Sequence, residues 1–289
     1  VERKVETTNT EAYEFYLKAK HKYEKRENKD DTEIARGLLK KALELDNNLI
    51  VAKNLLGWTY YETGDYDKAM EIYTSALKQS EKLGDKRGMG TSLGYIGGVY
   101  ADKGDIDTAL DYFDRSLAIT EELGDKRGMG ISLNSIGGLY DEKGDYDKTL
   151  DYYERSLVIT EELGDKYGMG ISLNNIGFVY WNKGDYEKAL SKYERSLAIR
   201  EELGDKRGLG DSLNNIGLVY WNKGDYKKAE VYLEKSLTLQ KEIGIKGLEL
   251  WTTTYLYLTY KHLGRENDLK EIHALIKEAE NIEFELNLR

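Results

Sequence analysis

Residues 130–169 read GISLNSIGGLYDEKGDYDKTLDYYERSLVITEELGDKYGM. Leu133, Ile136 and Tyr140 follow the i, i+3, i+7 spacing that places side chains on one face of a helix. Gly144–Asp145 then interrupts the pattern, because glycine readily ends a helix in the left-handed conformation and aspartate caps the start of the next one. A second apolar series follows and ends at another Leu-Gly-Asp. The stretch therefore predicts a helix, a two-residue turn and a second helix.

This unit recurs along the chain every 40 residues. Segments 90–129 and 130–169 are identical at 27 of 40 positions, and so are segments 130–169 and 170–209. Two series of glycines recur at intervals of 40 residues, without insertion or deletion. The first series is Gly57, Gly97, Gly137, Gly177 and Gly217, and the second is Gly64, Gly104, Gly144, Gly184, Gly224 and Gly264. A repeat of this size cannot bury its apolar face alone, so the 289 residues predict one elongated array.

The composition agrees with long helices and excludes several classes of function. The chain has no Pro, where average usage of about 5% predicts roughly 14. It has no Cys, which removes disulfides and thiolate sites and fits a reducing compartment, so we expect a cytoplasmic protein. The net charge of −10 argues against nucleic acid as a partner. No apolar run approaches the ~18 residues of a membrane span, so we expect no membrane insertion.

Several residues of the first complete unit carry a family resemblance. Residues 54–61 (NLLGWTYY), residues 64–66 (GDY), Ala69, Tyr73 and Ala76 resemble the tetratricopeptide signature, in which small and aromatic residues stand at set offsets in a helical hairpin. The 40-residue length is similar to the long-helix variant of kinesin light chains, LGN-type adaptors and many bacterial signalling arrays. Serine replaces the usual alanine at one position, and because serine is nearly as small, close packing should survive: Ser116, Ser156, Ser196 and Ser236.

The resemblance implies an all-α fold, a superhelical solenoid of tetratricopeptide repeats. We expect residues 1–10 to be a tail or linker and residues 11–289 to form a single solenoid. Its hairpins, about seven by the repeat count, are expected near 11–46, 48–87, 88–127, 128–167, 168–207, 208–247 and 248–284. Because Val1 is not Met and no clear capping helix ends the chain, we expect a piece of a longer protein.

In this family the first helix of each pair lines a concave groove. In the kinesin and LGN branches, asparagines there hold the backbone of an extended peptide. The resemblance implies this role for five asparagines: Asn134, Asn174, Asn175, Asn214 and Asn215. A carboxamide suits the role because it both donates and accepts hydrogen bonds. The alternative is that some of these side chains bond across the repeat interface or face water.

Two further positions of the first helix change character along the array. Early repeats carry acids at Asp102, Asp141 and Glu142. Later repeats carry an aromatic and apolar set: Trp181, Trp221, Phe178 and Leu218. We therefore expect a partner segment to place apolar anchors near the tryptophans and a basic portion toward the acids, since exposed aromatic patches mark binding surfaces. The alternative is that both tryptophans pack as core between neighbouring hairpins.

No motif in the chain indicates catalysis. The Gly88–Gly90 segment has no preceding strand and no Gly-Lys-Ser/Thr ending, so it is not a phosphate loop. Asp65 and Asp67 lack the remaining ligands of a calcium loop. His262 and His273 have no accompanying metal-ligand pattern. We expect no catalytic residue, cofactor or metal, and not an enzyme.

The sequence thus favours a non-catalytic scaffold that binds a protein or an extended peptide in its concave groove. One alternative is the regulatory region of a bacterial signalling enzyme such as a nucleotide cyclase or kinase, which the near-uniform units resemble. Another is a peptide-pheromone receptor of the Rap kind, although the chain shows no separate N-terminal three-helix domain. Self-association through the terminal repeats is a further expectation.

Overall fold

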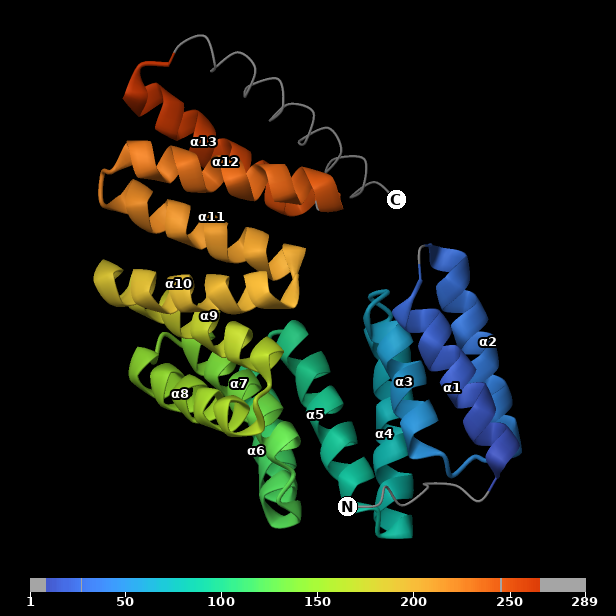
Figure 1. The fold of residues 1–289 in the computed structure, drawn as a ribbon. Helices are drawn as coiled ribbons and strands as arrows, with labels where there is room; N and C mark the ends of the chain where they lie inside the picture. Colours follow the sequence, from blue (N-terminus) through green and yellow to red (C-terminus); the bar gives the residue numbers. More distant parts are fainter. Residues whose placement is uncertain (1–8, 27, 245, 266–289) are drawn as a thin grey trace. The chain divides into compact units, whose positions relative to one another are not determined.

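The computed structural model describes residues 9–26, 28–244 and 246–265 (Figure 1). Every regular element in these ranges is an α-helix, and thirteen helices follow one another through short turns, which confirms the all-α repeat fold. The chain divides into two units, residues 1–143 and 144–289. Most of the expected N-terminal tail and the expected last helix, from 266 onward, lie outside the described residues.

Among its described residues the first unit holds seven helices: α1 (Thr10–Glu24), α2 (Lys29–Leu45), α3 (Ile50–Tyr61), α4 (Tyr66–Leu83), α5 (Lys86–Asp102), α6 (Ile106–Leu123) and α7 (Lys126–Glu142). Consecutive helices pack against each other. In addition α5 contacts both α3 and α7, so these three form a row of neighbouring first helices.

The second unit holds six helices within the described ranges: α8 (Tyr146–Leu163), α9 (Lys166–Asn182), α10 (Tyr186–Leu203), α11 (Lys206–Asn222), α12 (Tyr226–Ile243) and α13 (Lys246–Leu263). Consecutive helices again pack together, and α11 contacts both α9 and α13. Each unit therefore repeats one arrangement, in which first helices touch their counterparts 40 residues away.

The turns follow the sequence pattern. Gly84 adopts φ of 68°, and the next amide, that of Asp85, donates to the Ser80 carbonyl at 2.9 Å and closes the end of α4. The Asp85 carboxylate then accepts from the amide of Gly88 at 3.0 Å and caps α5. Because Asp85 is the cap, α5 begins at Lys86 rather than at the expected residue 88.

The recurring glycines of the first series lie where first and second helices touch. A Cβ at Gly177 would lie 2.8 Å from the ring of Tyr193, and one at Gly217 would lie 2.7 Å from Leu233 Cγ. Glycine is therefore required at these positions by close packing against a large side chain of the second helix. The buried core follows this seam; in the second unit it includes Tyr193 at 1% exposure.

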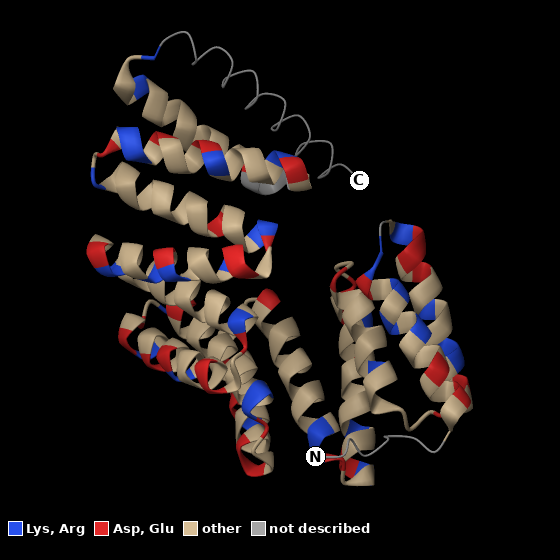
Figure 2. Ribbon diagram, in the orientation of Figure 1, with Lys and Arg blue, Asp and Glu red and all other residues tan. Residues whose placement is uncertain are grey.

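Charge is distributed unevenly between the two kinds of helix. Figure 2 shows acidic and basic residues along the length of α8 and α10 and few in the middle of α5. Within the described helices α5, α7, α9 and α11, charges occupy the first and last turns, and Asp211 is the one exception. The middle of these four helices is thus uncharged in all but α11.

In the part of the chain that the structure describes, no helix combines the length and apolar character needed to span a membrane.

Candidate binding sites

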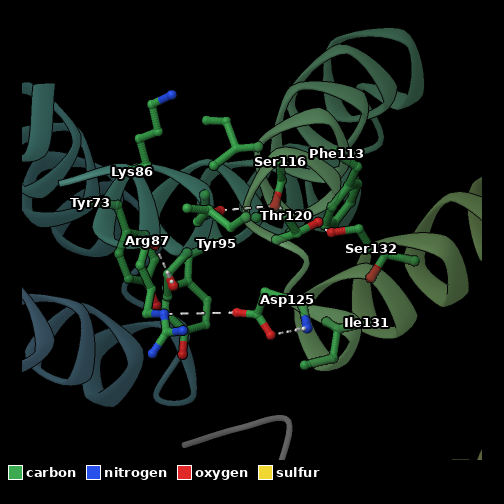
Figure 3. Close-up of a pocket in the computed structure, with 18 of the residues that line it drawn as sticks. Tyr73, Lys86, Arg87, Tyr95, Phe113, Ser116, Thr120, Asp125, Ile131 and Ser132 are labelled. Carbon is green, nitrogen blue, oxygen red and sulfur yellow. Dashed lines mark hydrogen bonds and ion pairs between the residues drawn. The ribbon is translucent and has the colours of Figure 1, made fainter. Parts of the chain in front are cut away.

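The first unit contains a cavity of about 420 Å³ along its row of first helices (Figure 3). Trp58 and Tyr61 reach it from α3 and Tyr95 from α5. In Figure 3, Tyr73 and Tyr95 lie on one side of the cavity, and Phe113 and Ser132 lie on the other. The lining is mostly apolar and aromatic, which is the character of a pocket that takes a ligand side chain.

Two glycines of α5 create the space. Gly94 stands where most repeats have Asn, and Gly98 stands where Trp58, Phe178 and Leu218 occur, although the next repeat also has glycine, Gly138. A Cβ at Gly94 would meet only Ser116 Oγ, at 3.5 Å, and a Cβ at Gly98 only the Tyr61 hydroxyl, at 3.9 Å. These are ordinary contact distances, so neither glycine is required by packing. Their effect is to leave the cavity open.

The aromatic side chains of the cavity form one cluster. The ring centroids of Trp58 and Tyr61 lie 5.1 Å apart, and those of Trp58 and Tyr95 lie 5.7 Å apart. Tyr95 stacks on Tyr73 at 4.9 Å. The Tyr73 hydroxyl is buried and has no hydrogen-bond partner among the described residues, and burial raises its pKa. One wall of the cavity is therefore aromatic, and it includes the Tyr73 hydroxyl, which has no hydrogen-bond partner among the described residues.

Charged side chains stand at the rim. Arg87 Nε lies 3.9 Å from Asp125 Oδ2, and a dashed line in Figure 3 marks this ion pair. Lys86 also lines the cavity and pairs with Glu122. The side chains of Arg87 and Lys86 are well exposed, so they contribute charge around the opening of the cavity and do not fill it.

The acids expected as ligand contacts lie elsewhere in the first unit. Asp102 is exposed and accepts a hydrogen bond from the Tyr61 hydroxyl. Asp141 is half-buried; its Oδ1 has no partner within the described ranges, and burial together with Glu142 raises its pKa. Glu142 is exposed and Asn134 is half-buried. None of these four side chains lines the 420 Å³ cavity.

Sequence reasoning missed Trp58, Tyr61 and Tyr95 as candidate contacts. The available signal was the comparison of equivalent positions, which shows Gly94 and Gly98 one turn apart and opposite large aromatics of the preceding repeat. In the structure the missing side chain is what makes room.

In the second unit the two tryptophans are largely packed. Trp181 contacts the core around Tyr193, and Trp221 meets Tyr255 edge to face at 5.3 Å. The indole N–H groups of both are buried without an acceptor in the ranges that the structure covers. Leu218 is buried, whereas Phe178 is 40% exposed beside Trp181, with centroids 5.7 Å apart. The exposed part of this set is therefore Phe178.

The asparagines of the second unit connect neighbouring repeats. Asn214 is buried, and its Oδ1 accepts from Thr252 at 2.9 Å. Asn215 Nδ2 donates to Asn174 Oδ1 at 3.0 Å. Asn54 in the first unit makes the same kind of contact, accepting from Ser92 at 3.1 Å. These side chains thus hold adjacent first helices together, the alternative that the sequence had left open.

A second, polar cavity of about 220 Å³ lies between α9 and α11. Asn174 and Asn175 line it, and four charged residues surround it: Arg200, Asp205, Arg207 and Asp211. No cluster of three or more His, Asp or Glu side chains suited to a metal ion occurs among the residues described.

Comparisons with known proteins agree with this architecture. A family model described as tetratricopeptide repeat matches residues 88–162 and 168–242, and a second model of that description matches residues 51–83. No curated protein matches the chain.

Several solved structures are similar. The apo form of RapI aligns with a TM-score of 0.70 at 17% identity, over 94% of this chain and 98% of that one. A Rap protein complexed with Competence and Sporulation Factor gives 0.69 at 17% identity, over 95% and 76%. BtubC (BKLC) from P. vanneervenii gives 0.66 at 19% identity, over 77% and 92%. At these identities the likeness shows a shared fold.

Proposed function

Because this chain belongs to the tetratricopeptide repeat family, whose repeats typically form protein-interaction scaffolds, we propose that it binds an extended segment of a partner along its first helices. In this proposal one apolar side chain of the segment enters the cavity formed by Trp58, Tyr61 and Tyr95. The scaffold itself performs no chemistry.

The single observation that supports this function best is the open aromatic cavity of the first unit. Gly94 and Gly98 could each carry a side chain without a clash, as the equivalent positions of most other repeats do; Gly138 is the exception. A well-packed array would gain by filling that space, since buried apolar area contributes about 25 cal/mol per Å². An incoming side chain would gain the same contacts, and a preformed cavity lowers the ordering cost of binding.

Other expected contacts remain part of the proposal, each within its own unit. In the first unit we propose that Asp102, Asp141 and Glu142 attract basic residues of the partner and that Asn134 contacts its backbone. In the second unit we propose an apolar contact at Phe178, which Trp181, Trp221 and Leu218 support. We also propose contacts to the partner's backbone from four asparagines: Asn174, Asn175, Asn214 and Asn215.

A pocket-filling variant tests this function. Peptides selected from a random displayed library would be compared by fluorescence polarisation on the wild type and on Gly98→Leu, which places at this position the residue that the array carries at 218. We expect at least tenfold weaker binding. Gly37→Leu is the matched control, because Gly37 is exposed on α2 with nothing within 4 Å of its Cβ position. Equal binding of the selected peptides to all three proteins would contradict the proposal.

A peptide receptor is the second candidate, and the nearly full-length likeness to RapI favours it. In that case the ligand is a short free peptide rather than a segment of a folded partner. Binding of selected sequences as isolated short peptides, with affinity equal to that of the same sequences inside a protein, would favour the receptor. If the array is instead the regulatory region of a signalling enzyme, the same groove binds the ligand. The difference from the scaffold proposal is that binding would then control a catalytic domain.

A further inference from the structure

Three departures from the repeat meet at the 220 Å³ cavity of the second unit. They are Tyr167, Arg200 and Asp211, and all three line this cavity. At the position of Tyr167 other repeats have arginine: Arg87, Arg127 and Arg207. At the position of Arg200 they have uncharged residues: Ser80, Thr120, Thr160 and Gln240. At the position of Asp211 they also have uncharged residues: Thr91, Ile131, Ile171 and Trp251. Units 130–169 and 170–209 share 27 of 40 residues, so three coincident changes around one cavity mark a site that differs from the other junctions.

Arg200 is built into the wall of the cavity. It is 6% exposed, Nη1 pairs with Asp205, and the guanidinium lies over the ring of Tyr167 at 4.8 Å. A Cβ at Gly170 would lie 2.7 Å from Arg200 Nε, and one at Gly208 would lie 2.6 Å from it. The guanidinium therefore occupies a slot that only the two glycines leave free. Its Nε is buried with no acceptor among the described residues.

Two further charged residues line the cavity. Arg207, which is exposed, and Asp211, which is half-buried, stand one turn apart on α11 and attract each other electrostatically, and neither side chain is hydrogen-bonded to another side chain of the described residues. Burial raises the pKa of the Asp211 carboxyl, although Arg207 and Arg200 act in the opposite direction. Because Arg200 and Asp205 neutralise each other, one positive and one negative group are left for a ligand.

We propose that this cavity binds a free α-amino acid, with its carboxylate at Arg207 and its ammonium group at Asp211. Side chains one helical turn apart have Cβ atoms roughly 5–6 Å from each other. The head of an α-amino acid presents both charges within such a span, whereas a peptide terminus carries only one. An inorganic anion would face two carboxylates, and a simple cation would face two guanidinium groups.

The size and polarity of the cavity agree with this ligand. Its 220 Å³ lies below the range of about 300–1,000 Å³ that holds drug-sized molecules. Asn175 and the hydroxyl-bearing Ser212 add polar groups to the lining, and the aromatic ring of Tyr167 adds an apolar surface for the aliphatic part. This site goes beyond the proposed peptide groove, and it shares with that groove the two asparagines Asn174 and Asn175.

The test is calorimetric titration of the full chain with each proteinogenic amino acid. We expect at least one to bind with a dissociation constant below about 1 mM, which corresponds to roughly −4.1 kcal/mol. For that amino acid, the N-acetyl derivative and the carboxamide derivative should each bind at least tenfold more weakly, because each lacks one of the two charges. Absence of binding by all of them, or a derivative that binds as well as its parent, would overturn the proposal.

Variants assign the binding to this cavity. Asp211→Ile introduces the residue that the array carries at 131 and 171, so it should fold, and it should weaken binding at least tenfold. Asp211→Asn keeps the size and should weaken binding to the same degree. Glu154→Gln, on an exposed position of α8, should leave it unchanged. Unchanged affinity in both Asp211 variants with folded protein, shown by circular dichroism, would place the binding elsewhere and refute this site.

Discussion

Ser196 Oγ on α10 donates a hydrogen bond to the carbonyl oxygen of Gly170 on α9, 2.9 Å away. The same Oγ lies 3.2 Å from Oγ of Ser212 on α11. Because the single hydroxyl proton of Ser196 is committed to Gly170, Ser212 is the donor in the second contact. One serine thus joins three helices of the second unit. The first unit repeats this arrangement with Ser116, which bonds to Gly90 at 2.9 Å.

The serine contact predicts a non-additive pair of mutations. Ser196→Ala should lower the free energy of unfolding by about 1 kcal/mol, because it removes one buried hydrogen bond and leaves the Ser212 hydroxyl without an acceptor. Adding Ser212→Ala should restore part of the loss, since the stranded hydroxyl is then gone. Urea denaturation of the two single variants and the double variant measures the coupling. Strictly additive losses would show that the two hydroxyls do not interact.

The two classes of glycine in the first helices predict opposite effects of alanine. Gly177→Ala should destabilise by about 1–3 kcal/mol, because its Cβ would lie 2.8 Å from the Tyr193 ring. Gly98→Ala should stabilise by up to about 1 kcal/mol, because the space is open and alanine is the better helix former. Thermal melts of the two variants give the comparison. Equal shifts in the same direction would contradict the packing assigned to Gly177.

Arg36 predicts a large effect of one charged side chain. It is 8% exposed, and it donates from Nε to Thr59 Oγ1 at 3.0 Å and from Nη2 to the Thr59 carbonyl at 2.6 Å and to Thr63 Oγ1 at 2.7 Å. Arg36→Met should therefore cost about 3 kcal/mol, because charged donors of buried hydrogen bonds are lost between α2 and α3.

A surface ion pair provides the control for Arg36. Lys103 Nζ lies 2.8 Å from Asp67 Oδ1, but both side chains are exposed, so Lys103→Met should not change the urea midpoint measurably. Comparable shifts for the two variants would mean that burial does not decide the strength of these contacts.

The half-buried Asp141 predicts a pH effect with a definite sign. Burial, and next to it Glu142, raise the pKa of this carboxyl above its unfolded value. In the window between the two values the folded state binds more protons than the unfolded state, so the free energy of unfolding falls as pH rises through it. Asp141→Asn should remove this fall and make the variant relatively more stable at neutral pH than at acid pH.

The measurement for Asp141 is urea denaturation at several pH values. Glu142→Gln provides the comparison, and it should remove only the smaller part of the effect because burial is the larger cause. A stability difference between Asp141→Asn and wild type that stays constant from acid to neutral pH would show that this carboxyl is not perturbed by folding.

The recurring elements could be predicted from the sequence because they depend on residues within one helical turn. Glycine at position 164 followed by Asp165 ends one helix and caps the next through contacts that span only a few residues. Such short-range choices repeat wherever the letters repeat. The same logic identified the family on residues 54–76.

The candidate sites required distances between residues about 40 positions apart. Whether Trp221 is surface or core depends on Tyr255 of the following first helix, and Asn214 bonds across the repeat interface because Thr252 reaches it. A single repeat contains neither partner, so its pattern allows both interpretations. The cavity at Gly98 likewise exists only because Trp58 and Tyr61 of the preceding repeat stand beside it.

The sequence by itself therefore determined the helices, their turns and the family, since hydrogen bonds and caps along one helix settle them locally. The tertiary structure decided which side chains remain free to bind. The surface of a first helix is covered or exposed according to the size of the side chains on its two neighbouring helices. The effect of Gly94 and Gly98 therefore depends on which side chains lie beside them in the folded chain. The polar cavity at Arg200 and Asp211 follows the same rule, because its walls come from α9, α10 and α11 together.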